Sequence, residues 1–214
     1  MGEKYIMIKE FETYKDFLKF IKSKVYRKVG FGSEGSCYWG KDGLAYKVIE
    51  SFLYKKNVNE IITSDKYKDL NYFALPIDIY TNPDHSIIYG YNSNFLHDDI
   101  LQHSEDFFEE VDLDKLVKCY YMLLSDIRTI SNDNIFLFEL INNLLFNNIK
   151  FMLIDTLDYY KEDYNTYDDN VNMILRAIEL PLYVETNDQA FNDEKSIEEI
   201  AENVKKHVKK RKYY

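Results

Sequence analysis

The amino-acid sequence predicts an α+β protein, with a small antiparallel β-sheet and a mainly helical second part. A glycine-rich hairpin over residues 30–49 indicates the sheet. Apolar residues that recur every three or four positions between 113 and 130 indicate a long amphipathic helix. Because 46% of the 214 residues are hydrophobic, the chain can bury the core of one large domain or of two small lobes around a cleft.

The composition argues against several classes of protein. A net charge of -10 disfavours a general nucleic-acid binder, because binding to a phosphate backbone needs clustered positive charge. No apolar run reaches the roughly 18 residues that cross a bilayer, and the charges within residues 1–9 argue against a cleaved signal peptide. Cys37 and Cys119 are the only cysteines, which suits a reducing compartment. We therefore expect a cytoplasmic protein without a nucleic-acid or membrane partner.

The first elements surround the glycine-rich segment. Apolar residues from Phe11 to Val25 predict a helix that precedes it. Two more β-prone runs, 73–80 and 86–91, flank a turn at Asn82-Pro83-Asp84 and predict further strands of the sheet.

The glycine-rich segment itself predicts a phosphate-binding hairpin. Gly30, Gly32 and Gly35 have the spacing G-x-G-x-x-G. They precede strands at 36–39 and 44–49, which are joined by Lys41-Asp42-Gly43, and an Asp-Gly pair here predicts a type I′ turn. The glycines therefore lie on a hairpin and do not open a helix, as they would in a dinucleotide-binding βαβ unit. Lys47 follows on the second strand, where its ammonium can reach a phosphate held under the glycines.

The second part of the chain repeats a simple order after its long helix. A strand is followed by Asn143, a second strand, a turn at Asn147-Asn148, a third strand and then Asp155.

Together these segments resemble the protein kinase superfamily over roughly residues 26 to 160. The resemblance implies a two-lobed fold, with a β-rich nucleotide-binding lobe at 1–91 and a truncated, mainly helical lobe at 92–214. It implies that ATP is the cofactor, that the glycine-rich loop covers its phosphates, and that Lys47 pairs with them. It further implies that Asn143 and Asp155 hold Mg²⁺, and that Glu60, on a helix between two strands of the small lobe, pairs with Lys47.

Several positions depart from the family pattern. The catalytic aspartate should lie five residues before Asn143, where this chain has Phe138, and no His-Arg-Asp triplet is present. Glu139 is the nearest carboxylate and the alternative catalytic base. After Asp155, the Phe-Gly pair is missing. The short remainder predicts a helix at 170–178, an extended segment at 180–185 and a C-terminal helix that begins with the capping box of Ser196 and Glu199.

We therefore expect a kinase-like protein that binds a purine nucleotide with Mg²⁺ and is a pseudokinase, with weak or no phosphoryl transfer. One alternative is an active kinase of a protein or small molecule that uses a non-standard catalytic loop with Glu139 as base. The other is an interaction module that kept the fold without the nucleotide and binds a protein partner. The retained glycines, Lys47, Asn143 and Asp155 weigh against the second alternative.

Overall fold

The computed structural model describes residues 6–32, 34–50, 65–102, 104–186 and 195–211. The chain divides into two compact units, one made of Met1–Asp69 with Ala74–Phe95 and the other of Leu70–Phe73 with Leu96–Tyr214. The sequence predicts a boundary after residue 91 and places residues 70–73 in the first lobe, whereas the structure assigns them to the second unit.

The first unit contains a six-stranded sheet in the order β1-β5-β6-β4-β3-β2. All neighbouring strands are antiparallel except β1 and β5, which are parallel. The class is therefore α+β as expected, but the sheet is mixed. Its elements are β1 (Met7–Glu10), α1 (Tyr14–Lys24), β2 (Val25–Gly32), β3 (Gly35–Gly40), β4 (Leu44–Ile49), the 3-10 turn Asp65–Tyr67, β5 (Asp78–Thr81) and β6 (Ile88–Asn94).

Strand β1 was not predicted, because its pairing partner lies about seventy residues away in the sequence and its own residues alternate poorly. Lys9 of β1 forms an ion pair with Asp78 of β5, at 2.6 Å between Nζ and Oδ2. Asp78 is buried and also accepts a hydrogen bond from the Asn92 side chain on β6. This polar contact fixes β1 to the edge of the sheet.

Helix α1 covers one face of the sheet. The Thr13 side chain accepts a hydrogen bond from the Asp16 backbone N–H and so caps the helix. Phe17 and Ile21 of α1 are buried together with alternate residues of the strands beneath. These strand residues are Tyr46, Val48, Tyr80 and Tyr89.

The hairpin of β3 and β4 is confirmed, but its turn differs from the prediction. Gly43 has φ +82, whereas neither Lys41 nor Asp42 has a positive φ, so the turn cannot be type I′. The Gly43 N–H donates to the Gly40 carbonyl, which closes a three-residue loop that ends in a left-handed glycine. Asp42 favours this geometry because its side chain accepts hydrogen bonds from the Leu44 N–H and the Tyr46 hydroxyl.

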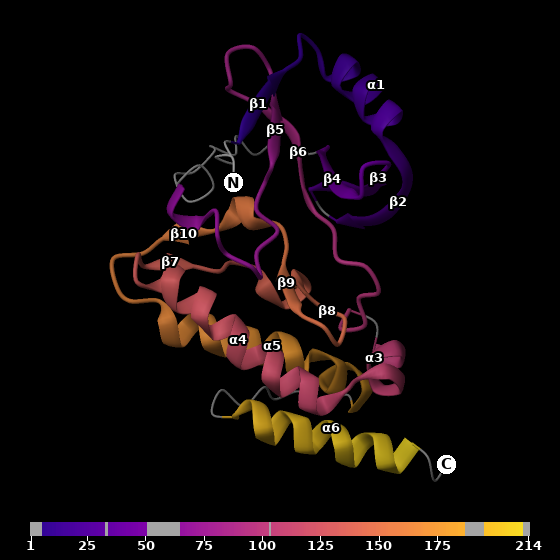
Figure 1. Cartoon of the computed structure of the whole chain (residues 1–214), viewed down its shortest axis with the longest axis vertical. Helices are drawn as coiled ribbons and strands as arrows, with labels where there is room; N and C mark the ends of the chain where they lie inside the picture. The colour runs from indigo at the N-terminus through magenta and orange to yellow at the C-terminus, as the bar shows by residue number, and fades with distance from the viewer. Residues whose placement is uncertain (1–5, 33, 51–64, 103, 187–194, 212–214) are drawn as a thin grey trace. The chain divides into compact units, whose positions relative to one another are not determined.

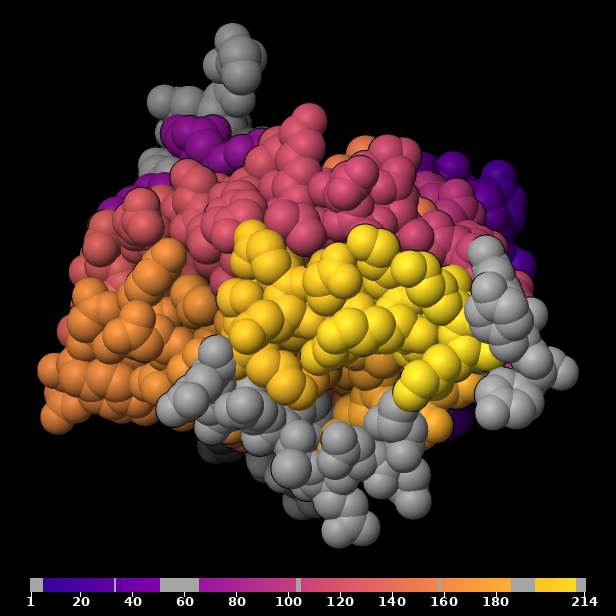
Figure 2. Space-filling model, turned by 90° about the horizontal axis from the view of Figure 1, so that it is seen from below, coloured from indigo at the N-terminus to yellow at the C-terminus, as the bar shows by residue number. Residues whose placement is uncertain are grey.

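The second unit is mainly helical. Its elements are α3 (Ser104–Glu110), α4 (Leu113–Ser131), β7 (Ile135–Phe136), the 3-10 turn Leu140–Asn142, β8 (Leu144–Phe146), β9 (Phe151–Leu153), the 3-10 turn Thr156–Asp158, β10 (Tyr160–Lys161), α5 (Tyr167–Thr186) and α6 (Ile197–Arg211). The predicted apolar stripe of α4 is confirmed, since Leu116, Leu123, Ile127 and Ile130 are buried. Helices α4, α5 and α6 pack against one another, and α6 covers one face of the unit (Figures 1 and 2).

The C-terminal part contains one confirmed prediction and one error. Ser196 and Glu199 form the predicted reciprocal capping box at the start of α6. The extended segment expected at 180–185 is wrong, because α5 continues through Pro181 to Thr186. Ala177, Ile178 and Leu182 are all buried on α5, and this continuous apolar stripe outweighs the hydrogen bond that Pro181 cannot donate.

Candidate functional site

Lys47 lies in the middle of the six-stranded sheet. Its register partners are Cys37 on β3 and Tyr91 on β6, and the same row continues to Gly30 on β2. Because successive side chains on a strand point to opposite faces, and Tyr46 and Val48 pack under α1, Lys47 is on the other face. Lys47 is half-buried there. The structure thus places Lys47 and Gly30 in one row on the sheet face that lacks α1.

The three glycines lie on the hairpin of β2 and β3, as predicted, but they differ in their surroundings. Gly32 pairs with Gly35 where the two strands meet. A Cβ atom at Gly35 would overlap the Val48 carbonyl oxygen, so the fold itself requires glycine at this position. A Cβ at Gly30 would meet only the Cys37 Cβ, at 3.9 Å, and one at Gly32 would meet nothing within 4 Å. The fold does not require Gly30 and Gly32, which leaves their backbone open to approach.

Asn143 and Asp155 lie at the same end of the hairpin formed by β8 and β9. Asn143 directly precedes β8, and Leu144 of β8 pairs with Leu153 of β9. The Ile154 N–H donates to the Asn143 carbonyl at 2.8 Å, which holds the residue before Asp155 against Asn143. Both side chains are half-buried. The predicted order from Asn143 through two strands to Asp155 is therefore present, but the 3-10 turn Leu140–Asn142, and not a strand, directly precedes Asn143.

The backbone at Asp155 has a left-handed conformation, with φ 57 and ψ 45. Aspartate tolerates this region better than most residues. The chain turns here from β9 into the 3-10 turn Thr156–Asp158. The left-handed backbone therefore places Asp155 at a sharp change of direction, directly after Ile154, whose N–H donates to the Asn143 carbonyl.

Phe138 and Glu139 lie in the loop between β7 and Asn143. Phe138 is 43% exposed, and its ring centroid lies 6.1 Å from that of Tyr160 on β10. Glu139 is exposed and has φ 53, an unusual conformation for glutamate. Phe138 thus contributes an aromatic ring, and no proton acceptor, at the position expected for a catalytic base.

Asn170 fixes this loop to α5 and was not identified from the sequence. Its side chain is fully buried, at 0% exposure, and accepts a hydrogen bond from the Leu137 N–H at 2.9 Å. Its amide group donates to Ser131 at the end of α4, to the Ile135 carbonyl and to the Thr166 hydroxyl. An asparagine four residues before Ile174, on an otherwise apolar stripe, was the available sequence signal.

Asp126 provides a second anchor, for the segment 70–73. One carboxylate oxygen of Asp126 accepts hydrogen bonds from the Asn71 N–H at 2.6 Å and the Tyr72 N–H at 3.0 Å. The Tyr72 carbonyl in turn accepts from Leu153 of β9 at 2.7 Å. Burial raises the pKa of Asp126, and the two backbone hydrogen bonds oppose that rise. The segment 71–73 thereby lies beside β9, the strand that leads to Asp155.

The metal-binding capacity of the described chain is limited. No group of three His, Cys, Asp or Glu side chains is close enough to hold a metal among the residues that the structure describes. Because Mg²⁺ at a nucleotide takes few protein ligands and completes its shell with phosphate and water oxygens, this finding does not argue against the predicted pair of Asn143 and Asp155. Glu60, the expected partner of Lys47, lies outside the described residues.

No known family model and no curated protein matches this chain. In the described ranges, no helix has both the length and the apolar character needed to span a bilayer.

Proposed function

We propose that this chain is a minimal, two-lobed, protein-kinase-like protein that binds ATP with Mg²⁺ and has weak or no phosphoryl transfer. The placement of Asn143 and Asp155 at one end of the β8–β9 hairpin carries the proposal. A carboxylate and an amide oxygen, fixed through the Ile154 hydrogen bond, are a suitable protein ligand set for Mg²⁺ on nucleotide phosphates.

The first unit supplies the groups that would contact the phosphates. Lys47 is the cation, held rigidly because its strand is paired on both sides. Gly30 and Gly32 lie in the adjoining hairpin, where the absence of side chains lets the backbone N–H groups approach phosphate oxygens. Loss of transfer follows from Phe138, because an apolar side chain cannot accept the proton of an attacking hydroxyl.

The proposal is tested by thermal unfolding in the presence of ATP, with and without Mg²⁺. At one hundred times its Kd, the nucleotide should raise the free energy of unfolding by about 2.7 kcal/mol. Lys47→Ala should weaken binding under both conditions, whereas Asp155→Asn should remove only the part that depends on Mg²⁺. Lys15→Ala and Asp163→Asn, both at exposed positions, are the matched controls. If ATP and GTP give no shift at millimolar concentration, the nucleotide-free interaction module is the better hypothesis.

An active kinase is the second candidate, and the backbone of Glu139 favours it. Left-handed non-glycine residues cost of the order of 1 kcal/mol and cluster at active sites. If Glu139 is a catalytic base, Glu139→Gln should lower ATP turnover by about 10²- to 10⁴-fold with little change in affinity. We expect turnover near background and no effect of this substitution. If the wild type phosphorylates itself or a substrate robustly and Glu139→Gln abolishes this activity, the active kinase is the better hypothesis.

A further inference from the structure

The segment from α1 through β2 has a charge opposite to that of the chain as a whole. Residues 14–32 contain six Lys and Arg residues and one Asp, whereas the whole chain has a net charge of -10. All six cationic residues are exposed. They are Lys15, Lys19, Lys22, Lys24, Arg27 and Lys28.

These charges have few anionic partners. Within the described part of the first unit, Lys19 alone of the six forms an ion pair, with Asp16 at 2.8 Å. Lys22 and Lys24 lie in the last turn of α1, where the helix dipole favours them. That explanation does not apply to Arg27 and Lys28, because both lie within β2.

Arg27 and Lys28 are held in place by aromatic rings. The Arg27 guanidinium carbon lies 5.7 Å from the Trp39 ring centroid, and the Lys28 ammonium lies 5.2 Å from that of Phe31. A cation over a ring face loses less water than one buried in an ion pair, and it stays available to an anion. The strand therefore presents two positioned cations.

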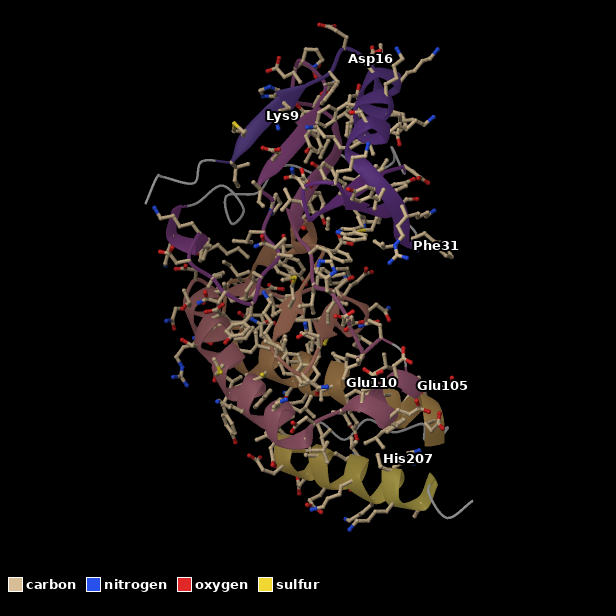
Figure 3. The ribbon with its side chains drawn as sticks, turned by 45° about the vertical axis from the view of Figure 1, so that its right-hand side comes forward. Lys9, Asp16, Phe31, Glu105, Glu110 and His207 are labelled. Atoms are coloured by element: carbon tan, nitrogen blue, oxygen red, sulfur yellow. The ribbon has the colours of Figure 1, made fainter. Side chains whose placement is uncertain are left out.

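Strand β2 also presents apolar side chains and an open backbone edge. It is the last strand in the sheet order, and β3 is its single neighbour among the described strands. Tyr26 is 65% exposed and Phe31 is 85% exposed, and Figure 3 shows Phe31 projecting outward from the sheet. Register shifts at Tyr26 and Val29 interrupt the ladder, so a partner strand could pair with only short stretches of β2.

We propose that the β2 surface, made of Tyr26, Arg27, Lys28, Val29 and Phe31, binds an acidic, extended peptide segment of another protein. Carboxylates of the peptide would pair with Arg27 and Lys28, its apolar side chains would cover Tyr26 and Phe31, and its backbone would pair with the open edge. A second copy of β2 would not serve as the partner, because it would bring the same positive charges face to face.

A nucleic acid fits this surface less well than a peptide. Nucleic-acid bases would stack on exposed rings, but Lys28 and Arg27 already lie over the faces of Phe31 and Trp39. A carboxylate can pair with these cations without displacing them from the rings. An open strand edge also offers backbone hydrogen bonds that only a peptide can complete.

The test uses the full chain and a capped peptide that repeats Glu-Glu-Val-Val over the eight-residue length of β2, because an extended backbone then presents Glu on both faces, as the neighbouring residues Arg27 and Lys28 require. We expect saturable binding by calorimetry at low salt, slower hydrogen exchange of the β2 amides, and weaker binding as salt screens the charges. Arg27→Glu/Lys28→Glu should weaken the affinity about tenfold or more, which corresponds to about 1.4 kcal/mol. Lys205→Glu/Lys206→Glu on α6 changes the net charge equally and should leave the affinity unchanged.

Three results would overturn the proposal: no binding of the peptide up to about 1 mM, equal loss of affinity in both double variants, or tighter binding of an oligothymidylate of the same length. If Arg27→Glu/Lys28→Glu fails to fold, Lys28→Gln and Phe31→Ser provide milder versions of the same comparison. The proposal is independent of nucleotide binding, since Lys47→Ala should not alter peptide affinity.

Discussion

Gly32 and Gly35 face each other across one hairpin, but the structure gives only one of them a steric reason to be glycine. The backbone of β4 passes so close to Gly35 that a methyl group has no room, whereas Gly32 faces open space. A glycine that the packing does not require is a candidate for ligand contact, because the missing side chain leaves room for another molecule.

We predict that Gly35→Ala and Gly32→Ala will separate stability from binding. Gly35→Ala should destabilise the protein by about 1–3 kcal/mol, since the Val48 carbonyl must move. Gly32→Ala should change stability by less than about 0.5 kcal/mol but weaken ATP binding about tenfold, because the methyl group would occupy the space proposed for the phosphates. Denaturant unfolding and nucleotide titration measure the two effects. Unchanged ATP affinity in a stable Gly32→Ala variant would remove Gly32 from the proposed site.

Among the elements, the β8–β9 hairpin depends on contacts that lie outside its own sequence. Segment 71–73 lies beside β9 because Asp126 of α4 accepts its two backbone N–H groups. The loop that leads to Asn143 is attached to α5 through Asn170. Two buried polar side chains therefore position the elements that carry Asn143 and Asp155.

We predict that Asn170→Leu will destabilise the protein by about 2–4 kcal/mol, since it leaves the buried Leu137 N–H without its acceptor. Leucine keeps the branching of asparagine, but its two methyl groups are bulkier than the amide, so overpacking adds to the loss of hydrogen bonds. Hydrogen exchange at the Leu137 amide should accelerate more than at amides of α4. Asn142→Ala, at an exposed position of the same loop, is the control and should be near neutral. Wild-type stability in Asn170→Leu would show that the loop is held by other contacts.

Substitutions of Asp126 should have a pH signature. Asp126→Ala should cost about 2–4 kcal/mol by leaving two N–H groups without an acceptor, whereas Asp126→Asn keeps an acceptor oxygen and should cost less. Burial raises the pKa of Asp126, so the folded state holds the proton more tightly than the unfolded state. The stability of the wild type relative to Asp126→Asn is therefore greatest below the ordinary carboxyl pKa and should fall as pH rises through the raised value.

Urea unfolding of the wild type and of Asp126→Asn at a series of pH values between about 3 and 7 measures the difference in their free energies of unfolding. The titration of all groups that the two proteins share cancels in this difference. If the free energy of unfolding of the wild type rises with pH relative to that of Asp126→Asn, the two backbone hydrogen bonds outweigh the effect of burial on the pKa of Asp126.

For the whole molecule, the sequence was informative where structure is local. The strands of the β3–β4 hairpin and the α6 capping box involve neighbouring residues, and both were predicted correctly, although the type of turn in the hairpin was not. Strand β1 was missed because it exists through parallel pairing of Met7 with Asp78, far along the chain. The predicted end of the helix at residue 178 was wrong, because the burial of Ile178 and Leu182 in the packed unit outweighed the local effect of Pro181.

The candidate site was predictable to a similar degree. The order of elements around Asn143 and Asp155 could be inferred from apolar runs and turn residues. The contribution of Asn170 could not, because three of its four partner groups lie in the stretch 131–137, more than thirty residues away in the sequence. The left-handed backbone at Glu139 gave no sequence signal either, since glutamate is not enriched in that region.

The assignment of residues 70–73 to the second unit means that the chain passes from one unit to the other three times, after Asp69, Phe73 and Phe95. A protease that cuts once after Phe95 would therefore leave segment 70–73, which belongs to the second unit, on the product that carries the first unit. The C-terminal product would lack the segment 71–73 beside β9 and would keep Asp126 without the backbone N–H groups that donate to it. Any continuous stretch of sequence that contains all of one unit must therefore also contain part of the other, since residues 1–95 include 70–73 and residues 70–214 include 74–95.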